Sequence, residues 1–356
     1  MSSIINVGLI GCGRIARLVH LNILKKSSQL RLVAIADSDT GGRDTAGKVA
    51  PEASVYPDFH DLLAAPDIDA VIICLPNSLH AEAALAALDR GKHIYLEKPL
   101  AGNTDEGRKV MDAWKNSSLT GMIGFNLRFN PLYRGIKKHI ESGGIGKVTY
   151  VRTVFSSSSH ALPMWKRHRE SGGGALLDLA SHHIDLVRYI LGTEIKDVFA
   201  RVRSYKTEHD HAVLQLTTAD GLEIQSFFSL DSIEKDEIEI YGTNGKLTAD
   251  RYLSINVEVT ESDANNQGRL RQLQRGISSL LRSPNLKDKM LAPGREPSFE
   301  LALNQFASAV RNNHKCSPDF EDGYMSLSVI EAAEESARSG AVISINDYPK
   351  RELTGL

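Results

Sequence analysis

The feature that most constrains the fold is a glycine-rich loop directly after a short apolar run near the start of the chain. Residues 4–10 read IINVGLI, and Gly11-Cys12-Gly13-Arg14-Ile15-Ala16 follows at once. Short runs rich in β-branched residues are typical of buried parallel strands. Residues 14–26 then have the spacing of a helix. A strand, a tight loop and a helix in this order predict the first unit of a doubly wound α/β sheet.

The same loop predicts a site for a dinucleotide. Gly11 permits the tight turn, Gly13 lets backbone N–H groups approach a pyrophosphate, and Ala16 allows the helix to pack closely on the strand. The N-terminus of the helix supplies partial positive charge to the phosphates. The alternative, a tight turn that packs without a ligand, is less consistent with the strand and helix on either side. The residues of this loop assigned to the cofactor are Gly11, Cys12, Gly13, Arg14 and Ile15.

The end of the second expected strand indicates which dinucleotide binds. Residues 31–36 are apolar after Arg31, and Asp37 and Ser38 follow them. A carboxylate at this position can accept a hydrogen bond from a ribose 2′-hydroxyl. No arginine follows directly, so a 2′-phosphate would meet both Asp37 and Asp39. The sequence therefore favours NAD over NADP, with Asp37 and Ser38 in the cofactor site.

The pattern of elements divides the chain into two domains. Apolar runs alternate with helical segments up to about residue 125, which is typical of a parallel doubly wound sheet. Longer β-like segments follow at 147–155, 194–204, 212–218, 222–230 and 236–241, with hairpin turns at 219–221 and 243–245. We expect an α/β protein with a Rossmann domain at 1–125. Residues 126–356 are expected to form an α+β domain with a large, mostly antiparallel open sheet.

Composition excludes several other classes of protein. A chain of 356 residues with a net charge of −2 has no global attraction to nucleic acid or anionic membrane. No apolar run approaches the roughly 20 residues that cross a bilayer. The start of the chain reads directly into the first strand, and the three cysteines have no spacing for metal or redox work. We expect a cytoplasmic protein with reduced thiols and no resident metal.

Two groups of polar residues are candidates for catalysis. Lys98 follows Glu97 and precedes Pro99 at the end of the apolar run 93–96, so it should face the crevice at the carboxyl ends of the strands. Asp178 and His182 lie four residues apart on an apolar helix over 175–187. A structural His–Asp pair in the core is the alternative for that helix, and a metal site has no further ligand cluster to support it.

Together these segments resemble the glucose–fructose oxidoreductase and inositol dehydrogenase family, usually written Gfo/Idh/MocA. The resemblance rests on the glycine loop, residues 75–80 (LPNSLH), Glu97-Lys98-Pro99, residues 124–131 (GFNLRFNP) and the run from Gly172 through Asp178 and His182. It implies hydride transfer between NAD and a hydroxyl carbon of a sugar, cyclitol or related polyol. It also implies a cis bond between Lys98 and Pro99, and a homodimer or homotetramer joined through the C-terminal sheet.

The resemblance also assigns roles to single residues. Lys98 is implied as the catalytic lysine, His182 as the proton-transfer residue and Asp178 as a ligand for substrate hydroxyls, although either Lys98 or His182 could make the direct proton transfer. The residues implied to line the nicotinamide half of the cofactor are Leu75, Pro76, Asn77, His80, Glu97 and Lys98. The residues expected to contact the substrate are Lys98, Asn126, Arg128, Trp165, Asp178 and His182.

Two basic segments leave the substrate and the outcome open. Residues 165–169 (WKRHR) precede the triple glycine, and residues 268–295 carry seven Lys or Arg residues against a single acid, Asp288. They are either solvated faces or subunit contacts, or they meet an anionic substrate such as a sugar phosphate or nucleotide-linked sugar. Two other functions remain possible on this scaffold: cleavage of a glycoside through transient hydride removal, and NAD sensing without catalysis.

Overall fold

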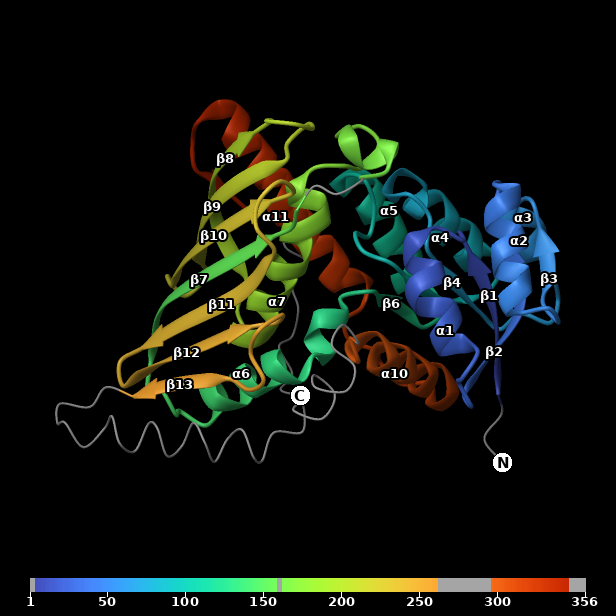
Figure 1. Ribbon diagram of the computed structural model, residues 1–356, viewed down its shortest axis with the longest axis horizontal. Coiled ribbons are helices and arrows are strands. Elements are labelled where there is room, and N and C mark those ends of the chain that lie inside the picture. The colour runs from blue at the N-terminus through green and yellow to red at the C-terminus, as the bar shows by residue number, and fades with distance from the viewer. Residues whose placement is uncertain (1–3, 159–161, 262–295, 346–356) are drawn as a thin grey trace.

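The protein is described here from a computed structural model, which covers residues 4–158, 162–261 and 296–345. Its described parts form two sheet domains side by side, a parallel sheet that carries the N-terminus and a larger sheet built from the second half of the chain (Figure 1). Helices lie between the two sheets. No helix of the described ranges is long and apolar enough to cross a membrane.

The N-terminal sheet is parallel throughout, with strand order β3-β2-β1-β4-β5-β6. Its strands are β1 (Ile5–Ile10), β2 (Leu30–Ala36), β3 (Ser54–Tyr56), β4 (Ala70–Ile73), β5 (His93–Leu96) and β6 (Gly121–Ile123). Its helices include α1 (Leu21–Leu24), α2 (Thr40–Val49), α3 (Phe59–Ala64), α4 (His80–Asp89) and α5 (Thr104–Lys115). The order reverses between β1 and β4, and in such sheets the crevice beyond the carboxyl ends of these strands binds ligands.

The C-terminal sheet is mixed, with order β13-β12-β11-β7-β10-β9-β8-β14. Its strands are β7 (Val148–Ser156), β8 (Ile195–Arg203), β9 (His211–Thr218), β10 (Glu223–Ser229), β11 (Lys235–Gly242), β12 (Gly245–Asp250), β13 (Glu258–Glu261) and β14 (Ile343–Ser344). Only β7 and β10 pair in parallel; the other neighbours are antiparallel. The predicted fold class, a Rossmann domain followed by a mostly antiparallel open sheet, is confirmed.

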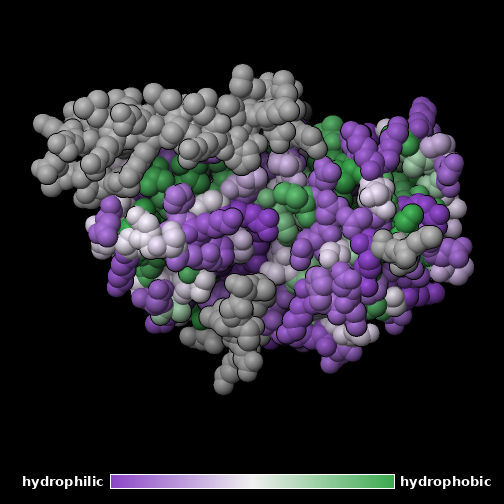
Figure 2. All heavy atoms as spheres, turned by 90° about the horizontal axis from the view of Figure 1, so that it is seen from below, coloured by the Kyte–Doolittle hydropathy of each residue, from purple (hydrophilic) through white to green (hydrophobic). Residues whose placement is uncertain are grey.

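Helices cover one face of this sheet. They are α6 (Pro131–Glu141), α7 (Ser181–Leu191) and α11 (Phe320–Ser339), and they lie on the side that faces the N-terminal domain (Figure 1). The opposite face carries no helix from the described part of the chain. Seen from below, the described surface of the N-terminal half is largely hydrophilic, with apolar patches separated from one another (Figure 2).

The late helix α10 (Ser298–Asn312) packs on the N-terminal domain although it follows strands β7 to β13 of the C-terminal sheet in sequence. Phe306 meets Tyr95 of β5 edge to face at 5.9 Å between ring centroids, and Phe299 meets His20 at 6.1 Å. Ala302 and Leu303 belong to the same buried cluster as the core residues of β1. The core of the Rossmann domain is therefore completed by residues far beyond 125.

Several elements were not expected from the sequence: α2, α3, β3, β12, β13 and β14. Five of them have at most six residues, too few to show a period, and the ten residues of α2 include three glycines, Gly41, Gly42 and Gly47. The first expected helix, over 14–26, ends nearer residue 24 and contains a π-helical turn, η1 (Ala16–His20). A second π-helical turn, η5 (Leu176–Ala180), precedes α7. Such turns occur frequently at functional sites.

Candidate active site

The glycine loop has the geometry that a pyrophosphate site needs. Gly11 has φ = +88°, and a Cβ there would lie 2.7 Å from the carbonyl oxygen of Cys74 at the end of β4. By contrast, a Cβ on Gly13 would meet no atom within 4 Å. The turn is therefore closed on the side of the sheet and open above Gly13, at the start of the helix. Backbone N–H groups at that helix start can donate to phosphate oxygens.

Asp37 is fixed directly beside this loop. Its Oδ2 accepts from the backbone N–H of Cys12 at 2.5 Å, and its Oδ1 accepts from the N–H of Asp39 at 2.8 Å. Arg43, which sequence reasoning did not select, donates to the carbonyl oxygens of Asp37 at 2.6 Å and Ser38 at 2.9 Å. The open loop and the adjacent carboxylate fit the phosphates and a ribose of NAD.

The two domains meet at a half-buried ion cluster between Lys98 and Asp178. Lys98 Nζ donates to the carbonyl oxygen of Asp178 at 2.6 Å and to its Oδ1 at 3.1 Å. Lys166 Nζ donates to the other carboxylate oxygen, Oδ2, at 2.7 Å. Lys166 was seen only as part of a basic run, because its partner lies twelve positions away across a loop. The carboxylate is thus held between two ammonium groups.

The electrostatics of this cluster favour a neutral histidine and an ionised acid. Burial lowers the pKa of His182 well below its usual 6.5, and the nearby Lys98 lowers it further. Burial would raise the pKa of Asp178, but Lys166 and Lys98 outweigh it and hold that pKa well below the usual range. Burial also lowers the pKa of Lys98, against the opposing effect of Asp178. His182 Nδ1 is buried without a hydrogen-bond partner within the described ranges.

The triple glycine allows three segments to cross at this point. A Cβ on Gly172, whose φ is +93°, would lie 2.6 Å from Cβ of Asn77, and Asn77 Nδ2 donates to the Gly172 carbonyl at 2.8 Å. A Cβ on Gly173 would lie 2.2 Å from the carbonyl oxygen of Lys166. The glycines therefore bring the loop that carries Lys166 and the loop after β4 against the start of the helix that carries Asp178.

The loop around Lys98 is braced by two buried histidines. His80 places Nδ1 2.6 Å from the carbonyl of Pro99 and Nε2 2.9 Å from the carbonyl of Leu75, so it joins the ends of β4 and β5. His20, at the end of η1, places Nε2 2.7 Å from Glu97 Oε1. The peptide bond between Lys98 and Pro99 is cis, as predicted. These contacts bring Leu75, His80 and Glu97 to the ends of β4 and β5; their contact with a cofactor, like that of Pro76, stays a prediction.

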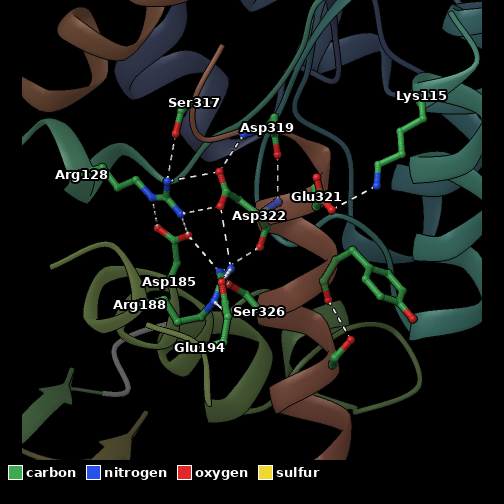
Figure 3. Close-up of polar contacts among 12 residues, drawn as sticks. Lys115, Arg128, Asp185, Arg188, Glu194, Ser317, Asp319, Glu321, Asp322 and Ser326 are labelled. Carbon is green, nitrogen blue, oxygen red and sulfur yellow. Dashed lines mark hydrogen bonds and ion pairs between the residues drawn. The ribbon is translucent and has the colours of Figure 1, made fainter. Parts of the chain in front are cut away.

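Other predicted site residues lie apart from this cluster. Arg128 is buried in an ion-pair network with Asp185 and Asp322 (Figure 3), with Nη2 2.5 Å from Asp185 Oδ1 and 3.0 Å from Asp322 Oδ1. Its guanidinium is occupied by these carboxylates, so a structural role fits Arg128 better than contact with a substrate. Asn126 is also buried, and its Nδ2 donates to Ser298 Oγ at 2.7 Å. Both residues connect the domains to α10 and α11.

The remaining predicted residues lie at the edge of the site. Trp165 is half-buried next to Lys166, whose Nζ lies 5.4 Å from the Trp165 ring centroid. Arg14 and Ser38 are exposed near the glycine loop. The basic segment 268–295 lies outside the described residues. Within those residues, no group of three or more His, Cys, Asp or Glu side chains could hold a metal ion.

Comparison with known proteins agrees with this geometry. The profile of the oxidoreductase family with an NAD-binding Rossmann fold matches residues 5–125, and that of its C-terminal alpha/beta domain matches residues 137–345. An inositol 2-dehydrogenase of Rhizobium meliloti (strain 1021) is 27% identical, with 96% of this chain and 99% of the relative covered.

Two further similarities involve levoglucosan dehydrogenase. The enzyme of Pseudarthrobacter phenanthrenivorans is 28% identical over 81% of this chain and 83% of its own. A solved levoglucosan dehydrogenase in complex with NADH has the same fold, with a TM-score of 0.84 at 24% identity over 98% of this chain and 100% of that chain. The chain therefore belongs to the Gfo/Idh/MocA oxidoreductase family, with an NAD-binding Rossmann domain and a C-terminal α/β domain.

Proposed function

We propose that this protein oxidises a secondary hydroxyl group of a sugar, cyclitol or related polyol, with NAD as the cofactor and Lys98, Asp178 and His182 as the residues that act on the substrate. NAD, when bound, accepts the hydride from the hydroxyl carbon. The observation that carries the proposal is the meeting of Lys98 with Asp178 across the two domains at 3.1 Å, one helical turn from His182. The family's inositol and levoglucosan dehydrogenases support this class of substrate.

Three residues of the chain have different roles in this reaction. A hydroxyl group must lose its proton as its carbon loses the hydride, and a neutral imidazole can accept that proton. His182 is suited to this role because burial and Lys98 keep it unprotonated. The Lys98 ammonium stabilises the negative charge that develops on the hydroxyl oxygen. Asp178 orients the substrate by accepting hydrogen bonds from neighbouring hydroxyls.

The test compares activity with stability in three variants. Lys98→Ala and His182→Ala should each lower kcat by roughly 10²–10⁴-fold, which is typical of lost acid–base or electrostatic assistance. Asp178→Asn should mainly raise KM. The dissociation constant for NAD should change little in His182→Ala. His60→Ala is a matched control, because that histidine is 53% exposed and its only ion pair among the described residues is with Glu82.

The outcomes separate this proposal from its alternatives. Near-normal turnover with a lowered melting temperature in His182→Ala would mean that the histidine is structural, and the proposed mechanism would be wrong. Conversion of a glycoside without accumulation of NADH would indicate glycoside cleavage. Tight NAD binding with no turnover of any polyol would indicate a sensor. The half-buried set of Lys98, Asp178 and His182 favours catalysis, since a sensor needs no such set.

One face of the C-terminal sheet, which no helix of the described residues covers, supports self-association. A row of side chains crosses four neighbouring strands there, from Val154 through Phe227 and Val213 to Arg201. Val213 is 45% exposed. Because apolar sheet faces seldom remain bare on monomers, we propose a homodimer or homotetramer joined through this face. Light scattering that shows only monomer at micromolar concentration would count against it.

The three unpaired cysteines support a cytoplasmic location as part of the same proposal.

A further inference from the structure

We infer that the substrate is a sugar acid, with a carboxylate close to the hydroxyl carbon that is oxidised, and that Lys166 is the residue that selects it. This inference rests on the proposed function and narrows its substrate class. Lys166 is placed on the same carboxylate as the catalytic Lys98, with Nζ 2.7 Å from Asp178 Oδ2. Its side chain is 26% exposed, against 13% for Lys98 and 16% for Asp178, so it lies at the more open side of the cluster.

The balance of charge in the cluster carries the argument. Two ammonium groups share a single carboxylate, and Asp178 is the only acid within ion-pair distance of either lysine in the described part of the chain. The negative charge of Glu97 also raises the pKa of Lys98, but Glu97 is already paired with His20. The cluster therefore has one positive charge in excess when His182 is neutral. Uncompensated charges away from water are costly, and this one is available for an anion.

Substrate binding should increase the imbalance. When Asp178 accepts hydrogen bonds from substrate hydroxyls, its two oxygens are shared between those hydroxyls and the two lysines. Lys166 then loses part of its interaction with the Asp178 carboxylate. A neutral polyol brings no negative charge that could replace it. A carboxylate on the substrate restores one-to-one pairing, because it can accept from Lys166 while the neighbouring hydroxyl lies between Lys98 and His182. Charge-assisted hydrogen bonds of this type are about twice as strong as neutral ones.

The loop holds Lys166 in this position before any substrate binds. Its backbone carbonyl lies against Gly173, where a Cβ would be only 2.2 Å away. Arg169, three residues on, pairs with Glu334 of α11, and its backbone N–H donates to Glu208 at 2.7 Å. A lysine on a free surface loop has no such anchors. These contacts fix Lys166 beside Asp178, which a solvated basic run on the surface would not require.

Equilibrium binding gives the direct test. D-glucuronate and D-galacturonate are titrated into the protein saturated with NADH, which prevents turnover, and each is compared with its parent hexose. We expect the acid to bind roughly 10–100-fold more tightly than the hexose in at least one of the two pairs, as one hydrogen bond to a charged group provides. The preference should shrink as salt is raised. Lys166→Met should reduce the acid-to-hexose ratio by a similar factor.

Ratios within one variant cancel any general loss of folding. Lys206→Met is the matched control, because that lysine is 63% exposed and its Nζ pairs with Asp231 instead of Asp178; it should leave the ratio unchanged. Equal or tighter binding of both parent hexoses would overturn the inference, as would an acid preference that survives in Lys166→Met. Tighter binding of glucose 6-phosphate than of either acid would mean that the site selects a phosphate group, and the assignment of a sugar acid would be wrong. The proposed function fails separately, if no polyol or sugar acid yields NADH.

Discussion

Replacement of Gly173 by alanine tests whether the crossing of the loop over the site helix determines the position of Lys166. The new Cβ would lie 2.2 Å from the carbonyl oxygen of Lys166 and 2.8 Å from that of His168. A carbon needs about 3.3 Å from an oxygen, so the crossing must open by about 1 Å. Both contacts are with backbone atoms, which cannot turn away as a side-chain end could.

The expected loss follows from that displacement. A shift of about 1 Å would lengthen the Lys166–Asp178 contact from 2.7 Å to roughly 3.7 Å, beyond hydrogen-bonding distance. We expect kcat/KM to fall roughly 10–100-fold. Overpacking should also lower the free energy of unfolding by about 1–3 kcal/mol. The dissociation constant for NAD should change much less than kcat/KM, because neither clash involves the glycine loop of residues 11–16.

The assay uses steady-state kinetics, an NAD titration and denaturant unfolding on the same preparations. Gly47→Ala provides the control, since a Cβ there would meet only Val55 Cγ2, at 3.9 Å, within helix α2. That change should raise stability by about 0.5–1 kcal/mol and leave kcat/KM unchanged. Wild-type turnover and stability in Gly173→Ala would refute the reasoning.

Three further predictions concern the cofactor, the pH profile and the buried network. Asp37→Ala should narrow the preference for NAD over NADP by a few kcal/mol at most, and titrations that show tighter binding of NADP to the unaltered protein would contradict the assignment. Because burial and Lys98 lower the pKa of His182 below 6.5, the acid limb of kcat/KM for oxidation should lie below pH 6.5; a limb centred above that value would exclude His182 as the base. Arg128→Met should lower the free energy of unfolding by about 3–5 kcal/mol in denaturant titrations, since Asp185 would be left buried without its main partner, and a loss under about 1 kcal/mol would be inconsistent with that role.

The sequence predicted the elements whose signals are local. Strand β1 and the glycine loop could be recognised because a β-branched run, two glycines and a helical period follow one another without interruption. Helix α2 could not, because Gly41, Gly42 and Gly47 lower its helical propensity, and its start depends on Asp39 accepting from the N–H of Gly42. The three-residue strand β3 exists only because β2 pairs with it.

The residues of the candidate site also divide into those that a local sequence pattern identifies and those that it does not. Asp178 and His182 could be paired from their helical spacing, and Lys98 could be placed from the proline that follows it. The partners of Arg128 could not be found, since Asp185 and Asp322 lie 57 and 194 residues away in sequence. Lys166 was visible only as one cation among several. Which of them meets the catalytic carboxylate depends on a backbone crossing that no short pattern encodes.

Helix α10 has a consequence for how the protein is made. The ribosome delivers the six strands of the N-terminal sheet first, but Leu303 and Phe306, which complete its core, emerge only after strands β7 to β13 of the C-terminal sheet. Domains usually fold in the order of their synthesis, at about 5–20 residues per second. Here the nascent first domain carries an uncovered apolar surface for many seconds. A fragment that ends at residue 125 should keep that surface permanently and depend on chaperones, whereas addition of the α10 segment as a separate peptide should cover it.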